Sequence, residues 1–239
     1  TGVQTCALPI LIEPHASDVI RQLFSDLHCH VKKPSKSVSK LFDNSTPFAR
    51  LQSEVLDLDM GSMKLKTRIA LHGKLRRGNI WTYDQLCSML TKFLGQAPSQ
   101  LNKDLADETV YSATIKLCKD FFARVGEILP LHLLDVDNFL EVHENSMFTK
   151  AIFATGLGYV GRSIVDEMMI DESMTWESAL KTMHSLESPM LSKADKFWQT
   201  AKVCMVDEGK IKIIKGTDKR IGSIICRELR IYPCKDLGA

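Results

Sequence analysis

The chain has 239 residues, 44% of them hydrophobic, which is enough to bury an ordinary core in one large domain or two small ones. Its net charge is only +2 at pH 7, and no run approaches the roughly 18 apolar residues of a transmembrane helix, so we expect no membrane contact. Seven cysteines without a Cys-x-x-Cys pair indicate reduced thiols inside a cell. Cys87 and Cys118 fall on helical apolar faces, where we expect packed hydrophobes.

The small net charge conceals an uneven distribution along the chain. Residues 30–83 contain eleven Lys and Arg against four Asp and Glu, residues 104–195 have a balance of −9, and residues 196–239 have a balance of +5. Clustered cations attract polyanions, so the basic regions are candidates for phosphate binding. Acidic and basic regions that face each other, or that are simply solvated, explain the same pattern equally well.

In chain order, the first predicted helix lies over residues 17–27, where apolar side chains recur at helical spacing after a Ser-Asp pair typical of an N-cap. It leads into a basic connector that contains Lys32, Lys33 and Pro34, and the proline biases Lys33 away from helical conformation. Cations on both sides of a proline, between two short helices, suit contact with phosphate groups. They suit a solvated loop nearly as well.

A Ser-rich basic helix follows the connector. It carries Lys36 and Lys40 and is predicted to close at Asp43. The next helix is then expected to begin with Thr46 as its N-cap and Pro47 at its first position, where a missing N–H group is tolerated.

The run FSDLHCHVKKPSKSVSKLFDNSTPFARL resembles the segment that follows the DGQHR motif in the DndB family of DNA sulfur-modification proteins. The positions that match that family's pattern are Phe24, Asp26, Leu27, Lys33, Pro34, Ser37, Leu41, Phe42, Asp43, Pro47, Ala49 and Leu51. His28 stands where the family prefers Asn, which points to a polar hydrogen-bonding role. The DGQHR motif itself is absent from this chain, and we expect it to have been lost upstream.

The resemblance implies a cytoplasmic bacterial protein of a DNA phosphorothioate-modification system that binds DNA and restrains its operon. It implies that residues 11–60 are the C-terminal part of a ParB/sulfiredoxin-like α/β domain and that residues 61–239 form a mainly helical domain. Residues 1–10 resemble translated sequencing-adaptor read-through and are expected not to be native. The expected partners are the DNA phosphate backbone, other sulfur-modification proteins and a second copy of the chain, without a cofactor. The expected phosphate contacts are Lys32, Lys33, Lys36, Lys40, Arg68, Lys74, Arg76 and Arg77.

The segment from residue 60 to residue 81 contains six cations and no acid. Lys64, Lys66 and Arg68 alternate with other side chains, which predicts a strand with its cations on one face. Turns are predicted at His72-Gly73 and at residues 77–79. A basic ribbon with an Arg-Arg-Gly tip would suit a nucleic-acid backbone, and a flexible surface loop is the alternative.

A helix is predicted from a capping box at residues 82–85 to Gly95. The remaining predicted segments are a polar linker over 96–107, a helix over 108–129 ended by Pro130, an ambiguous segment over 131–145, helices over 147–169 and 175–186, a β-hairpin over 203–214 and a final helix over 219–230. The sequence therefore predicts a fold that is mainly α with a small β component, an α+β fold.

The run Gly156–Gly161 reads Gly-x-Gly-x-x-Gly, but turn and cap residues follow it instead of the strand that a dinucleotide site requires. We therefore interpret its glycines as positions where a helix packs closely against a neighbour. No catalytic motif is present, and His28-Cys29-His30 lacks a second cluster at metal-ligand spacing, so we predict neither a catalytic nor a metal site.

Two alternatives to a DNA-binding regulator stay open. The family's motif resembles that of ParB-like folds, so the intact protein is alternatively a nucleotide-binding protein or NTPase whose phosphate motif is missing, with Lys32 and Lys33 as accessory contacts. The second alternative is a helical protein–protein interaction module whose acidic middle region recruits a basic partner.

Overall fold

The computed structural model describes residues 36–41, 43 and 45–238. The chain divides into two units, residues 1–34 and residues 35–239, and everything described belongs to the second unit. The predicted helix over residues 17–27 and the connector with Lys32 and Lys33 therefore lie outside the described residues.

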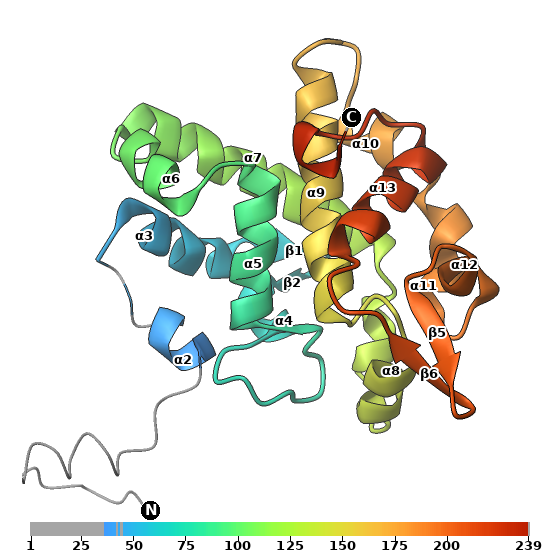
Figure 1. The fold of residues 1–239 in the computed structure, drawn as a ribbon. Helices are drawn as coiled ribbons and strands as arrows, with labels where there is room; N and C mark the ends of the chain where they lie inside the picture. Colours follow the sequence, from blue (N-terminus) through green and yellow to red (C-terminus); the bar gives the residue numbers. More distant parts are fainter. Residues whose placement is uncertain (1–35, 42, 44, 239) are drawn as a thin grey trace, which may run out of the picture. The chain divides into compact units, whose positions relative to one another are not determined.

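The second unit is mainly helical, as predicted, and its described residues form three small two-stranded sheets (Figure 1). The α-helices are α2 (Lys36–Leu41), α3 (Pro47–Glu54), α4 (Leu65–Arg68), α5 (Tyr83–Leu94), α6 (Pro98–Asp104), α7 (Glu108–Ile128), α8 (Phe139–Asn145), α9 (Ala151–Met168), α10 (Trp176–Leu180), α11 (Glu187–Leu191), α12 (Lys196–Thr200) and α13 (Asp218–Leu229). The 3-10 helices are η1 (Val55–Asp57), η2 (Leu131–Leu134), η3 (Met183–Leu186) and η4 (Lys235–Leu237). The strands are β1 (Asp59–Met60), β2 (Met63–Lys64), β3 (Ile69–Ala70), β4 (Trp81–Thr82), β5 (Cys204–Asp207) and β6 (Lys210–Ile213). No helix among these residues is long and apolar enough to cross a membrane.

Helix α9 is central to the packing, because both α5 and α13 lie against it (Figure 1). Its glycines allow this close approach. A Cβ atom added at Gly158 would lie 2.4 Å from the carbonyl oxygen of Met89 on α5, and one added at Gly156 would lie 2.7 Å from Cγ2 of Ile221 on α13. The predicted packing role of these glycines is confirmed. The Gly-x-Gly-x-x-Gly run lies within one helix, not at the strand-to-helix turn of a dinucleotide site.

Two helix starts that were predicted from capping residues, at Thr46 and at Thr82, are confirmed. The Thr46 side chain accepts a hydrogen bond from the backbone N–H of Ala49 at the start of α3. Thr82 and Gln85 form a reciprocal capping box at the start of α5. These local contacts satisfy backbone donors that helix formation leaves unpaired, so they depend on few residues and can be read from sequence.

The strand predicted across Lys64, Lys66 and Arg68 is wrong. Residues 65–68 form the single helical turn α4, which buries both Leu65 and Arg68 on one side. Lys64 itself ends the short strand β2, and the two residues after α4 are extended as β3, which pairs in parallel with β4. Alternation of polar and apolar side chains over six residues was therefore misleading. The same sequence also places Leu65 and Arg68 three positions apart, a spacing that puts both on one side of a helical turn.

Two other segments differ from their predictions. The polar linker over 96–107 contains α6, in which Pro98 takes the first turn and Leu101 is buried, followed by buried Leu105. The helix predicted over 175–186 ends at Leu180 and is followed by η3. In both places short helices formed because a few apolar side chains reach the core, not because a long apolar stripe is present.

Candidate nucleic-acid interface

Residues 71–80, here the basic loop, connect β3 to β4 and project beneath α4 in Figure 1. The two strands pair in parallel, Ile69 with Trp81 and Ala70 with Thr82. At the base of the loop the backbone N–H of Ile80 also donates to the carbonyl oxygen of residue 68, at 2.7 Å. The two ends of the loop are therefore held together by main-chain hydrogen bonds.

Residues 76–79 of the basic loop are held by hydrogen bonds to two other segments of the protein. The buried side chain of Asn79 accepts a hydrogen bond from the N–H of Arg76 at 2.9 Å and donates one to the carbonyl oxygen of Thr67 at 3.0 Å. The N–H of Gly78 donates to the carbonyl oxygen of Leu134 at 2.7 Å. Gly78 has a φ of 85°, which a residue with a side chain would adopt only with strain. The loop is thus ordered at residues 76–79.

Arg68, the last residue of α4, contacts the basic loop. Its side chain is only 6% exposed, and its two terminal nitrogens donate to the two carboxylate oxygens of Asp135, at 2.6 and 3.1 Å. One of them also donates to the carbonyl oxygen of Gly78, at 3.3 Å. Arg68, one of the expected phosphate contacts, is therefore turned inward, where its guanidinium holds the loop instead of facing solvent.

The cations of the basic loop itself, Lys74, Arg76 and Arg77, are exposed, but they differ in their partners. Arg77 forms an ion pair with Asp137 at 2.9 Å and also donates to the carbonyl oxygen of Asp135. In the part of the chain that the structure describes, Lys74 and Arg76 form no salt bridge. Their charges are therefore available to an anion.

Helix α2 brings further cations to the same place. Its buried Ser37 accepts a hydrogen bond from the N–H of Asp84, and Lys40 forms an ion pair with the Asp84 carboxylate at 2.7 Å. These contacts hold α2 at the N-terminal end of α5, the end that the basic loop also reaches (Figure 1). Lys36 is exposed there. We call Lys36, Lys74, Arg76 and Arg77 the basic end.

The remaining predicted positions are placed as follows. Asp43 is exposed and accepts hydrogen bonds from the N–H and the hydroxyl of Ser45, which lower the pKa of its carboxyl group. It closes the turn between α2 and α3. Asp26 and His28 lie outside the described residues, as do Lys32 and Lys33.

The acidic partners of the basic loop were not predicted. Asp135, Asp137 and His143 come from the segment over 131–145, which the sequence left ambiguous. His143 is buried, and its Nε2 lies 2.8 Å from the carbonyl oxygen of Asn79. Burial is the main reason why the pKa of His143 is lowered. No local pattern reveals these contacts, because more than fifty residues separate the partners in the chain.

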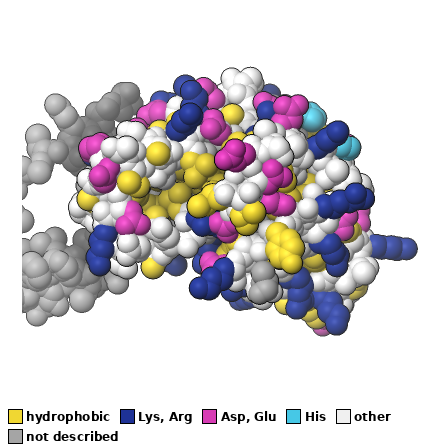
Figure 2. Space-filling model, turned by 90° about the horizontal axis from the view of Figure 1, so that it is seen from above, with side chains coloured by type: hydrophobic (Ala, Val, Ile, Leu, Met, Phe, Trp, Pro, Cys, Tyr) yellow, Lys and Arg dark blue, Asp and Glu magenta, His cyan; other side chains and the backbone are white. Residues whose placement is uncertain are grey.

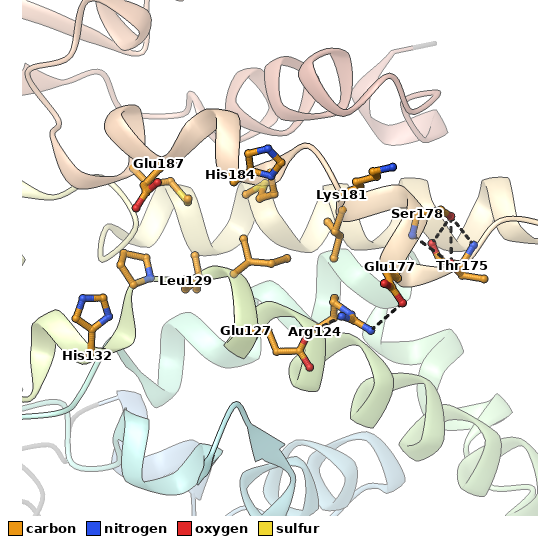
Figure 3. A pocket seen from close by; sticks show the side chains of 15 residues that line it. Arg124, Glu127, Leu129, His132, Thr175, Glu177, Ser178, Lys181, His184 and Glu187 are labelled. Atoms are coloured by element: carbon orange, nitrogen blue, oxygen red, sulfur yellow. Dashed lines mark hydrogen bonds and ion pairs between the residues drawn. The ribbon is translucent and has the colours of Figure 1, made fainter.

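A pocket of about 780 Å³ lies elsewhere, between the end of α7 and helices α10 and α11 (Figure 3). Arg124 pairs there with Glu127 and Glu177, and Thr175 and Ser178 cap one helix end. The side chains of His132, Lys181, His184 and Glu187 also line the pocket. Among the described residues there is no group of three or more side chains that could hold a metal ion.

The face seen from above in Figure 2, away from the basic loop, carries charges of both signs. Acidic side chains gather near its middle, and basic ones lie mostly to one side of them. A mixed surface of this kind attracts a polyanion less than the basic end does, where Lys74 and Arg76 lack acidic partners among the described residues.

The comparisons with known proteins bear on the class of this molecule. A family model described as "DndB: DNA-sulfur modification-associated" matches residues 4–227. No curated protein and no solved structure matches the chain. Because the family model covers nearly all of the 239 residues, the chain belongs to the DndB family, whose members are associated with DNA sulfur modification.

Proposed function

We propose that the chain is a DNA-binding regulatory or accessory protein of a bacterial DNA phosphorothioate-modification system, and that it acts in the cytoplasm. Family membership supports the link to DNA sulfur modification. The observation that carries the DNA-binding part is the pair Lys74 and Arg76, which are exposed, without a salt bridge among the described residues, and mounted on a loop fixed at its base.

Such a surface suits contact with the phosphate backbone. A loop that is already ordered loses little conformational entropy when it binds. Lysine and arginine that neutralise phosphates release condensed counterions, so binding of this kind weakens steeply as salt rises. Phosphate contacts carry no base sequence information by themselves, and the proposal is accordingly for binding with little sequence preference at the basic end.

The test is fluorescence anisotropy of the chain with a labelled DNA duplex, titrated at several salt concentrations. We expect the double variant Lys74→Ala and Arg76→Ala to bind more weakly. The plot of log affinity against log salt should become less steep, with the magnitude of its slope smaller by about 2, because each neutralised phosphate contributes roughly 0.9 to that magnitude.

The matched control is Lys64→Ala with Lys66→Ala. It removes the same number of exposed cations, but these two already pair with Asp59 and Asp57 at 2.8 Å. The control should keep the wild-type slope. Equal slopes for both variants would remove the basic loop from the interface, and an absence of binding at low salt would contradict the proposed function.

The nucleotide-binding alternative stays a prediction, because Lys32 and Lys33, its expected accessory contacts, lie outside the described residues.

A further inference from the structure

A second group of cations lies on the β5–β6 hairpin, on the residues beside it and at the start of α13. All of its members are exposed: Lys202, Lys210, Lys212, Lys215, Lys219 and Arg220. The acids within the same stretch are Asp207, Glu208 and Asp218, and Asp207 is already paired with Lys212. This part of the surface therefore has an excess of positive charge of its own, contributed by a segment far from the basic end in the sequence.

The hairpin places two of these cations on one face. In its antiparallel register Met205 lies opposite Lys212, and Asp207 lies opposite Lys210. Directly opposed residues point to the same side of a two-stranded sheet, as do alternate residues of one strand. Lys210 and Lys212 therefore share a face, and both line a groove of about 440 Å³ beside β6.

The other wall of the groove carries a lysine that is bound to a carboxylate. It is formed by the end of α8 and by residues 192–194. The Lys193 side chain is only 16% exposed, and its Nζ lies 2.6 Å from a carboxylate oxygen of Glu144. Behind it, the half-buried ammonium of Lys150 donates to the carbonyl oxygen of His143, and burial lowers its pKa.

The charges in this groove leave a positive excess. Of the three lysines that line it, Lys193 is bound by Glu144, and Lys212 is bound by Asp207, which lies on the same face of the hairpin. Lys210 forms no salt bridge among the described residues, so the groove keeps one uncompensated positive charge that favours an anion.

The end of α8 connects this groove to the basic loop. His143 contacts the carbonyl oxygen of Asn79 in the basic loop, and the next residue, Glu144, binds Lys193 in the groove. Figure 1 likewise shows α8 between the loop after β3 and the β5–β6 hairpin. The acids that lie along this path are largely paired, Asp137 with Arg77 and Asp135 with Arg68.

We infer that the groove between β6 and residues 192–194 is a second phosphate-binding site, and that a nucleic-acid backbone runs from the basic loop past α8 to the β5–β6 hairpin. This inference rests on the proposed function and extends it. Lys210 contacts a backbone phosphate, and Lys212 and Lys193, held by Asp207 and Glu144, line the groove on either side of it.

The test compares duplex binding by the wild type with that of Lys210→Gln combined with Lys212→Gln, at several salt concentrations. Glutamine preserves most of the side-chain length and removes the charge. We expect the magnitude of the slope of log affinity against log salt to fall by about 1, the contribution of Lys210, because Lys212 already pairs with Asp207. The matched control is Lys116→Gln with Lys119→Gln on α7, two exposed lysines that form no salt bridge within the described range and that should leave the slope unchanged.

The outcomes separate the two proposals. If the wild type binds and the hairpin variant behaves like the α7 control, the second site is wrong while the proposed function stands. If only the hairpin variant has a smaller slope, the second site is supported and the basic loop is removed from the interface. If the wild type does not bind duplex DNA at low salt, both proposals are wrong.

Discussion

Arg68 and Asp135 determine whether the basic loop keeps its position. The Arg68 guanidinium is buried, while the Asp135 side chain is 47% exposed. Within the described structure, the Nε of Arg68 has no hydrogen-bond partner. Asp135 and the carbonyl oxygen of Gly78 therefore compensate for the burial of its charge. Removing the carboxylate partner of a buried cation destabilises the fold strongly. Removing one partner of an ion pair at the surface has a smaller effect.

We therefore expect Asp135→Ala to lower the free energy of unfolding by about 2–3 kcal/mol. The control is Asp137→Ala, two residues away, whose side chain is 98% exposed and whose pair with Arg77 is solvated. It should change stability by less than about 0.5 kcal/mol. Urea unfolding of the three proteins measures both values, and similar losses in the two variants would contradict the structural role given to Arg68.

His143 should make stability depend on pH. Its pKa is lowered in the folded protein by burial and by the nearby Lys150, so the unfolded chain takes up a proton more readily. The free energy of unfolding should then be highest above the unfolded pKa of about 6.5 and should decrease as pH falls below it. The carboxyl groups with lowered pKa values, such as Glu144, titrate below this range and do not produce the same change.

The variant His143→Gln tests this, because an amide can still donate to the carbonyl oxygen of Asn79 but does not titrate. Its free energy of unfolding should vary less than that of the wild type between about pH 7.5 and pH 5.5. Parallel curves for the two proteins would show that another group causes the dependence.

Among the elements, α9 depends most on close helix contacts. A Cβ at Gly158 would lie 2.4 Å from the backbone oxygen of Met89, which cannot move without α5. A Cβ at Gly222 on α13 meets its nearest atom, Cβ of Tyr159, only at 3.1 Å. Both changes to alanine gain about 1 kcal/mol of helix propensity, so the difference between them reports the packing.

We expect Gly158→Ala to lower the free energy of unfolding by about 2 kcal/mol or more, and Gly222→Ala to lower it by clearly less. Urea unfolding of both variants beside the wild type measures the difference. If Gly158→Ala were as stable as the wild type, α5 and α9 could not pack as closely as the structure has them.

The sequence correctly predicted those helices, caps and turns that depend on contacts between residues close in the chain. The caps at Thr46 and Thr82 involve residues three positions apart, and the α5, α7 and hairpin patterns are long or regular. It did not predict α4 or α6. These short helices form because Leu65, Leu101 and Leu105 are buried in the core, with α6 packed against α3, and that information is not contained in the short runs themselves.

At the scale of the whole molecule, the charge pattern predicted which regions are basic but not which cations are free. Arg68 and Lys40 are paired with Asp135 and Asp84, whereas Lys74 and Arg76 have no such partner among the described residues. The difference depends on contacts between segments far apart in the chain. The groove beside β6 was missed for the same reason, since it forms only where the hairpin meets the end of α8.

Glu141 offers a gain-of-binding test of the same surface. It is an exposed acid on α8, between the basic loop and the hairpin groove, and should repel a DNA backbone that runs past this helix. We expect Glu141→Gln to raise duplex affinity about twofold to fivefold at low salt, with the gain fading as salt screens the charge. The same substitution at Glu172, an exposed acid after α9, should change nothing, and equal gains in both would indicate a nonspecific charge effect.

The most direct test of the DNA-contact surface is lysine reactivity measured with and without duplex DNA, by brief acylation of the wild-type protein and mass spectrometry of its peptides. The account predicts protection of Lys36, Lys74, Lys210 and Lys212, with Lys64, Lys66, Lys116 and Lys119 modified equally in both samples. Uniform protection of both sets, or protection of the second set alone, would contradict the proposed surface.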